Sequence, residues 1–305
     1  MADIIISMEA TCDLPQDIIG KYGFKVMPMH FYVDGKEFCT ATDTVATSGI
    51  YEKMENDART STSQISKATY EEYFGAFAKT GKPVLHIAFS SGISGTYRQA
   101  VMAAEALNAA GCNIYVVDSG CGGAAQGLLG ILCAEYAEGA ENVGAVIKYI
   151  EEIRFRMEHA FTVDNLKYLA RGGRLGGLAA FVGNMLKIKP VMKVDEHGKL
   201  MLDKKVLSRQ RAIRTLFTDY RAARDVSCKW CFISHAGCEK DARILADMIL
   251  AETGEAPVVY DLGPVLGSHA GPGTLAMFYL SVNSRKKEAA VPAPARYRLA
   301  RGRNI

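Results

Sequence analysis

The 305-residue sequence has little net charge and no long apolar segment. Its formal charge is only +3, and some of that charge lies in the last stretch, residues 284–305, which is rich in Lys, Arg, Ala and Pro. Nucleic-acid binding usually needs a larger and more clustered positive charge, so we expect no nucleic-acid partner. No run approaches the roughly 18 uninterrupted apolar residues of a transmembrane helix, so we expect no integral membrane segment.

Export signals are also missing from the start of the chain. Residues 1–7 form a short apolar run that contains Asp3, without a basic segment before it or a cleavage signal after it. The expected location is therefore cytoplasmic. In that reducing compartment the eight cysteines are expected to be free thiols and not a disulfide framework.

Three kinds of catalytic or metal motif are absent or incomplete. The sequence has no Gly-x-x-x-x-Gly-Lys phosphate loop, so ATP binding by that route is not expected. Ser94 is not predicted to be a hydrolase nucleophile, because a nucleophile elbow needs glycine two residues later and Thr96 stands there. Cys228 and Cys231 have the spacing of a zinc knuckle, but the strand predicted over residues 229–234 points them to opposite faces. We therefore expect no metal, no cofactor and no catalytic residue.

The first half of the chain alternates short β-branched runs with helical patterns. This alternation predicts a parallel sheet that is covered by helices on both faces. Asp13 is expected to cap the first helix, with Pro15 in its first turn and Gly20 or Gly23 at its end. A turn is expected at Asp34-Gly35, after the second strand. The other elements predicted in this half are strands over residues 4–8, 25–33, 84–89 and 113–117, and helices over residues 67–79, 94–110, 126–138 and 143–159.

Antiparallel pairing enters the second half of the chain. The apolar runs on either side of Glu196-His197-Gly198 are predicted to form a hairpin. The remaining predicted elements are helices over residues 209–221 and 239–253 and strands over residues 229–234 and 258–261.

These patterns predict an α/β fold with two different domains, as the length of the chain also favours. Residues 1–160 are expected to form a three-layer domain with a parallel sheet. Residues 161–283 are expected to form a two-layer domain with a mixed sheet, and residues 284–305 a basic, disordered tail.

Hydroxyls, glycines and one imidazole gather in three segments at predicted loop-to-helix junctions, residues 62–66, 90–97 and 267–273. Helix N-termini offer unpaired N–H groups and partial positive charge, so such segments favour an anion site. Each segment has an ordinary alternative, since Ser94 would also serve as a plain helix N-cap and Thr62 as a solvated loop hydroxyl.

His269 and two arginines are further candidates with open roles. His269 stands in Gly-Ser-His-Ala-Gly-Pro-Gly, which is expected to form a loop, and either a pocket role or a structural role fits it. Arg171 and Arg174 flank Gly172-Gly173, and such pairs either bind an anionic partner or lie on the surface as solvated charges.

Taken together, residues 62–66, 90–97, 168–174 and 267–273 resemble the DegV family of bacterial fatty-acid-binding proteins in order and separation. The resemblance covers about residues 4–281. It implies a two-domain α/β protein that holds one long-chain fatty acid, with the tail in an apolar tunnel and the carboxylate at the domain junction. It also implies a carrier subunit and not an enzyme, because a separate fatty acid kinase, a dihydroxyacetone-kinase-like ATPase, would phosphorylate the carboxylate to an acyl phosphate.

The resemblance also implies roles for single residues. Thr62, Ser94, the backbone N–H of Gly95 and His269 would bind the carboxylate, and Arg171 would contact the kinase. The chain departs from the family near its start, where it reads Met-Glu-Ala-Thr-Cys-Asp-Leu-Pro and the family usually has Thr-Asp-Ser-Thr-Ser-Asp-Leu-Pro.

Two other functions remain open from the sequence. A stand-alone enzyme acting on a carboxylated or phosphorylated metabolite would use the same donors, with His269 as a general acid or base. A ligand-sensing regulator would need a nucleic-acid surface, and only the basic residues 296–303 offer one.

Overall fold

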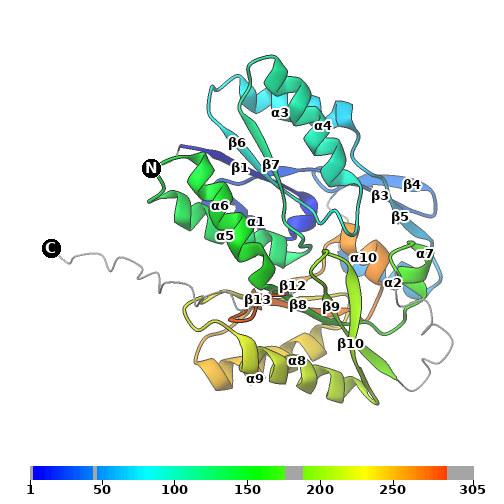
Figure 1. The fold of residues 1–305 in the computed structure, drawn as a ribbon. Coiled ribbons are helices and arrows are strands. Elements are labelled where there is room, and N and C mark those ends of the chain that lie inside the picture. Colours follow the sequence, from blue (N-terminus) through cyan, green and yellow to red (C-terminus); the bar gives the residue numbers. More distant parts are fainter. Residues whose placement is uncertain (1–2, 44–46, 176–187, 287–305) are drawn as a thin grey trace.

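The computed structural model describes residues 3–43, 47–175 and 188–286. Within these ranges the chain forms two α/β units, each built around its own sheet, and a small third sheet beside them (Figure 1). The first sheet is parallel and the second is mixed, which confirms the predicted fold class. The division at residue 160 stays a prediction, and the chain passes from the first unit to the second sheet through residues 154–156.

The first sheet has the strand order β2-β1-β6-β7 and is parallel throughout. Its strands are β1 (Ile5–Glu9), β2 (Lys25–Met27), β6 (Val84–Ala88) and β7 (Ile114–Asp118). Helices α3 (Lys67–Ala78) and α4 (Thr96–Ala109) pack on one face, and helices α1 (Gln16–Tyr22), α5 (Ala124–Ala137) and α6 (Val143–Ile153) on the other. All five residues of β6 are buried, as expected for a strand covered on both faces.

The second sheet has the order β10-β9-β8-β13-β11-β12, and only β11 and β12 pair in parallel. Its strands are β8 (Met157–Thr162), β9 (Lys189–Val194), β10 (Leu200–Val206), β11 (Cys231–His235), β12 (Val258–Asp261) and β13 (Leu275–Leu280). Helices α8 (Arg209–Ala223) and α9 (Glu239–Thr253) cover one face. The other face packs against α5 of the first unit, which explains why α5 is apolar nearly all round (Figure 1).

The third sheet was not predicted from the sequence. It consists of the antiparallel strands β4 (Lys36–Cys39), β3 (His30–Val33) and β5 (Thr60–Thr62). The single strand predicted over residues 25–33 is wrong: it is divided between β2 and β3 at Pro28, whose ring nitrogen has no hydrogen to donate to a sheet. Around this sheet lie α2 (Thr47–Glu55), α7 (Lys167–Arg171) and α10 (Pro264–Ala270).

Two further expectations for the fold are wrong. The helix predicted over residues 143–159 ends at Ile153, because residues 157–162 pair with β13 and β9 and are buried on both faces as strand β8. Asp13 does not cap α1: its backbone is left-handed, with φ of 53°, and its carboxylate accepts a hydrogen bond from the backbone N–H of Gly263 at 3.0 Å.

The predicted tail begins inside the described residues and continues beyond them. Arg285 is held against the body, since its guanidinium donates to the backbone carbonyls of Gly120, Arg154 and Asp195. Residues 287–305, and with them the basic stretch 296–303, lie outside the described residues. Over the ranges that are described, no helix combines the length and the apolarity needed to cross a membrane.

Candidate functional site

A cavity lies at the carboxyl ends of the parallel strands, where the first unit meets the second sheet and α10. Its volume is about 980 Å³, including the space at its open mouth. Most of its wall is apolar, with members such as Phe89, Ile93, Phe161, Leu200, Leu266 and Phe278. Polar side chains also line it, among them Thr62, Ser63, Gln64, Ser94, Arg174 and His269. A mainly apolar cavity with a few polar groups suits a ligand with a long apolar part and one polar end.

Thr62 and His269 meet in this wall although they lie far apart in the sequence. Thr62 is the last residue of β5, and its Oγ1 lies 2.7 Å from Nε2 of His269. The expectation that His269 stands in a loop is wrong, because α10 continues through Ala270 and the chain turns only at Gly271, with φ of 81°. The last turn of α10 therefore aims the imidazole at β5.

The His269 imidazole is neutral near pH 7. Burial and the nearby positive charge of Arg174 lower its pKa to about 4. Its Nδ1 is buried against Gly172, so closely that a Cβ atom added to this glycine would lie only 2.2 Å from Nδ1. This Nδ1 has no hydrogen-bond partner among the described residues. In the tautomer with the proton on Nε2, His269 donates to Thr62 and leaves the hydroxyl proton of Thr62 free for an acceptor in the cavity. An anion in the cavity favours that arrangement.

Ser94 lies in the cavity wall together with Thr62, on the loop that precedes α4, whereas the predicted site residue Gly95 is not among the residues that line the cavity. Helix α4 begins at Thr96 with Gly95 as its N-cap residue, so the reading of Ser94 as the N-cap is wrong by one position. The Ser94 hydroxyl accepts from the N–H of Thr96 at 3.2 Å and still lines the cavity. A Cβ atom at Gly95 would stand only 2.7 Å from Oε1 of Gln64, which shows how closely the two loops approach.

The two arginines of the predicted turn have different surroundings. Arg171 is half exposed at the end of α7 and pairs with Asp57, with 3.0 Å between Nη2 and Oδ1. Arg174 lines the cavity, and its positive charge contributes to the lowered pKa of His269. The sequence left both arginines as candidates for binding an anion, and the local pattern Arg-Gly-Gly-Arg does not reveal which of them faces inward.

His159 and Thr11 also line the cavity and were missed from the sequence. His159 was missed because its segment was predicted to be helical. In β8 it is buried, and its Nε2 accepts from the N–H of Gly122 at 3.2 Å. Burial, with a contribution from Arg285, lowers its pKa well below the ordinary value, so it is a neutral member of the wall.

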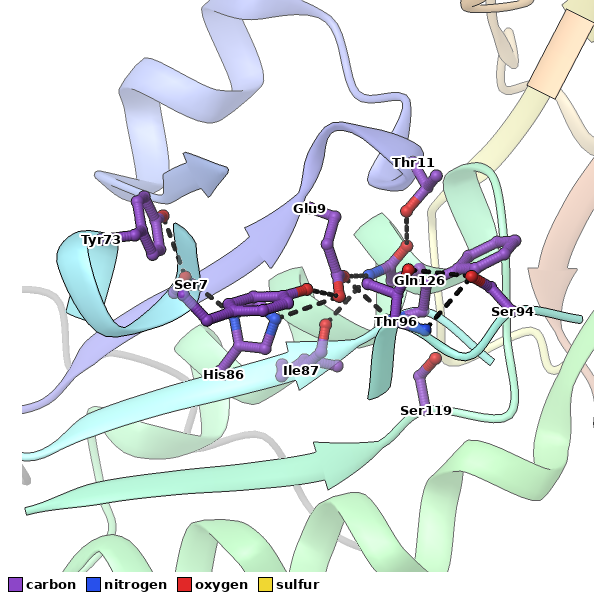
Figure 2. Close-up of polar contacts among 12 residues, drawn as sticks. Ser7, Glu9, Thr11, Tyr73, His86, Ile87, Ser94, Thr96, Ser119 and Gln126 are labelled. Atoms are coloured by element: carbon purple, nitrogen blue, oxygen red, sulfur yellow. Dashed lines mark hydrogen bonds and ion pairs between the residues drawn. The ribbon is translucent and has the colours of Figure 1, made fainter. Parts of the chain in front are cut away.

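The carboxylate of Glu9 is buried in the first unit and connects through Gln126 to Thr11 of the cavity wall (Figure 2). Oε1 of Glu9 accepts from Tyr70 Oη at 2.7 Å and from His86 Nε2 at 3.1 Å. Oε2 accepts from the backbone N–H of Phe89 at 2.9 Å and from Gln126 Nε2 at 2.8 Å. Burial by itself raises the pKa of Glu9, but the charge interaction and hydrogen bond with His86 and the bond from Tyr70 outweigh it and lower the pKa. Glu9 is therefore ionised at neutral pH.

No metal-binding arrangement occurs within the described ranges, where no three His, Cys, Asp or Glu side chains gather as metal ligands. All eight cysteines are free thiols. Burial raises the pKa of Cys228 to about 11 and that of Cys231 still further, so both remain protonated at neutral pH.

The fold and the cavity place the chain in a class of two-unit α/β proteins with an internal, mainly apolar cavity. The chain belongs to the DegV family: the family model described as "Uncharacterised protein, DegV family" matches residues 3–282. A DegV domain-containing protein of Clostridium perfringens is 31% identical over 285 residues, which cover 92% of this chain and 98% of the relative. The predicted family is confirmed.

Two solved structures share this fold at somewhat lower identity. A structure described as fatty acid binding of a DegV family protein from Thermus thermophilus is 26% identical, with a TM-score of 0.81 over 91% of this chain and 99% of the other. DegV of Bacillus subtilis, described as a fatty acid binding protein, is also 26% identical, with a TM-score of 0.77 over 92% and 100% of the two chains.

Proposed function

We propose that the protein binds a long-chain fatty acid, with the tail in the apolar cavity and the carboxylate at its polar end. The protein then presents that carboxylate to a separate fatty acid kinase, a dihydroxyacetone-kinase-like ATPase, which converts it to an acyl phosphate. The main support is that Thr62, Ser94 and His269, from three distant segments, line one mainly apolar cavity. The fatty-acid binding described for the two solved relatives points the same way.

The polar end suits a carboxylate because it offers hydrogen-bond donors, while the residues that line the described cavity include no Asp or Glu to repel a negatively charged ligand. We assign carboxylate binding to Thr62, Ser94, the N–H of Gly95 and His269, which also orients the Thr62 hydroxyl, and Arg174 adds positive charge nearby. A charge-assisted hydrogen bond contributes roughly 1.5–3 kcal/mol, and these bonds mainly offset the removal of the carboxylate from water.

Affinity must then come from the tail. Burying about 14 methylenes at ~0.8 kcal/mol each gives roughly 11 kcal/mol before the cost of ordering the chain. A short acid such as acetate lacks this contribution, so it would bind poorly to the same donors.

The carrier role divides the chemistry between two proteins. This sequence has no phosphate-loop motif, so the phosphoryl donor is assigned to the kinase. Arg171 lies outside the cavity wall and is half exposed, which suits the contact with the kinase that we assign to it. The alternative of a stand-alone enzyme gains no support, because a His269 pKa of about 4 is far from that of an effective acid or base at pH 7.

Native mass spectrometry of freshly purified protein, followed by lipid extraction, tests the binding proposal. We expect one bound long-chain fatty acid per chain, lost on denaturation. Protein that carries no lipid and also fails to bind added oleate would overturn the proposal. Acyl phosphate should then form from the loaded protein and ATP only when the kinase is supplied, whereas a stand-alone enzyme would react without it.

A further inference from the structure

Glu9 does not line the cavity, yet two of its four hydrogen bonds lead to residues that do. The first runs from Glu9 Oε2 to the backbone N–H of Phe89, whose side chain lies in the wall. The second runs from the same oxygen to Gln126 Nε2, and Gln126 Oε1 in turn accepts from Thr11 Oγ1 at 3.0 Å (Figure 2). Thr11 lies in the wall as well.

Phe89 is also the first residue of the loop, residues 89–95, that connects β6 to α4 and contains Ser94. It follows the last residue of β6, and Ser90 is then fixed by a bond from its N–H to the Cys121 carbonyl at 2.9 Å. The N–H of Ser94 donates to the Ser90 carbonyl at 3.1 Å. A shift of Phe89 would therefore be carried along a short, hydrogen-bonded turn to Ser94.

We propose that Glu9 is a positioning residue for the ligand site. Its buried carboxylate fixes the backbone of Phe89, and with it the loop to Ser94, and holds Thr11 in the wall through Gln126. The test of this inference by oleate affinity rests on the proposed fatty-acid site. The positioning of the loop is tested separately, by amide hydrogen exchange over residues 89–95.

What the position needs is an acceptor aimed at Phe89 and Gln126, and a glutamine can supply it. In Glu9→Gln the amide oxygen would face those two donors, and the amide NH₂ would face Tyr70 and His86. Both of these can become acceptors, Tyr70 by rotating its hydroxyl and His86 by carrying its proton on Nδ1. Nδ1 of His86 lies 3.0 Å from Ser7 Oγ, which can accept a hydrogen bond from the Nδ1–H group.

Glu9→Met removes the acceptor but nearly keeps the volume, so it is the disruptive variant. We expect the dissociation constant for oleate to rise about tenfold or more, the equivalent of one lost hydrogen bond in the loop. Amide hydrogen exchange over residues 89–95 should also accelerate by about tenfold or more in the ligand-free protein. Glu9→Gln should stay within about threefold of the unchanged protein in both measurements.

Ser7→Ala is the matched control. Ser7 is buried in the same network, where it is hydrogen-bonded to His86 Nδ1 and to Tyr73 Oη at 3.0 Å each, but it lies at the opposite end of the network from Thr11 and does not line the cavity (Figure 2). It should lower thermal stability and leave oleate affinity unchanged within about threefold. If Glu9→Met fails to fold, Gln126→Leu serves instead, because it releases Thr11 and should weaken oleate binding by about threefold to tenfold.

The outcomes separate this inference from the proposed function. If the unchanged protein binds no fatty acid, the proposed function is wrong, and the exchange measurement alone then decides the positioning role. Unchanged exchange over residues 89–95 in Glu9→Met would overturn the inference whatever the ligand. Equal loss of affinity in Ser7→Ala and Glu9→Met would also overturn it, since the effect would then reflect general destabilisation.

Discussion

The molecule holds one carboxylate permanently and offers a second place that suits a carboxylate. The Glu9 carboxylate is fully enclosed and accepts four hydrogen bonds, from a phenol, an imidazole, an amide and a backbone N–H. At the polar end of the cavity, Thr62 and Ser94 lie in the wall, and the neutral His269 is hydrogen-bonded to Thr62. The four donors around Glu9 offset the cost of removing a carboxylate from water during folding, whereas under the proposed function the donors in the cavity wall would offset the same cost only when a ligand binds.

The largest effect is expected when the Glu9 carboxylate is removed from its buried hydrogen-bond network. Glu9→Met leaves four donors without their acceptor in a buried setting, and we expect it to lower the free energy of unfolding by about 3–5 kcal/mol. Urea unfolding followed by circular dichroism measures this. Tyr70→Phe, which removes one donor and leaves the carboxylate paired, should cost only about 1 kcal/mol. Equal losses in the two variants would contradict the idea that the carboxylate organises this site.

Thr62→Val should weaken fatty-acid binding at the polar end of the cavity without much effect on folding. It removes the hydroxyl proposed to donate to the ligand carboxylate, so the dissociation constant for oleate should rise by roughly 10-fold to 100-fold. Displacement of a fluorescent fatty acid measures the change. Thr60→Val makes the same substitution two residues earlier on β5, where the hydroxyl donates to the Ser268 carbonyl at 2.8 Å, and should leave affinity nearly unchanged. A Thr62→Val protein with full affinity would remove Thr62 from the site.

Lowering the pH should reduce the stability of the folded protein through His269, which lies at the polar end of the cavity. Its pKa falls from the ordinary 6.5 to about 4 on folding, so between these values the unfolded chain binds a proton that the folded protein does not. Stability therefore falls as the pH is lowered through this window, by up to about 1.4 kcal/mol per pH unit from this residue. Unfolding free energies measured from pH 7 to 4 should show a shallower slope in His269→Gln. His159 contributes in the same direction and stays in both proteins, and identical slopes would contradict the assignment.

The smallest effect is expected at a third carboxylate, which is exposed. Asp57 pairs with Arg171, and the hydrogen bond and charge of Arg171 hold the pKa of Asp57 below its usual value. Because water already solvates both groups, Asp57→Asn should leave the melting temperature unchanged.

Arg171→Ala should slow acyl-phosphate formation by the kinase and keep oleate affinity. A loss of oleate affinity in Arg171→Ala would place this arginine in the ligand site instead.

Local patterns were enough to predict much of the first unit. The apolar run over residues 84–89 is the fully buried strand β6, and the prediction that Gly23 or Gly20 ends the first helix is confirmed at Gly23, with φ of 65°. The turn predicted at Asp34-Gly35 is confirmed by left-handed backbones at both residues. Each of these features depends on neighbours in the sequence, so periodicity and turn chemistry contain the information.

The errors occur where distant segments decide the local structure. Residues 157–162 read as part of a helix, but pairing with β13, more than 100 residues later, makes them a strand. His269 reads as a loop residue because of its glycines, but packing of α10 between α2, α7 and β5 keeps it helical. His159 gave no local signal of lining a cavity, and the pattern around Arg174 did not show that this arginine, and not Arg171, faces inward.

By itself the sequence determined the two kinds of sheet, the order of most helices and strands, and the segments rich in hydroxyls and glycines. Only the tertiary structure decided that Thr62 meets His269 across 207 residues and that Glu9 meets Gln126 across 117. The physical reason is that hydrophobic periodicity is set by neighbours along the chain, whereas a buried polar group finds its partners only when separate units pack and exclude water.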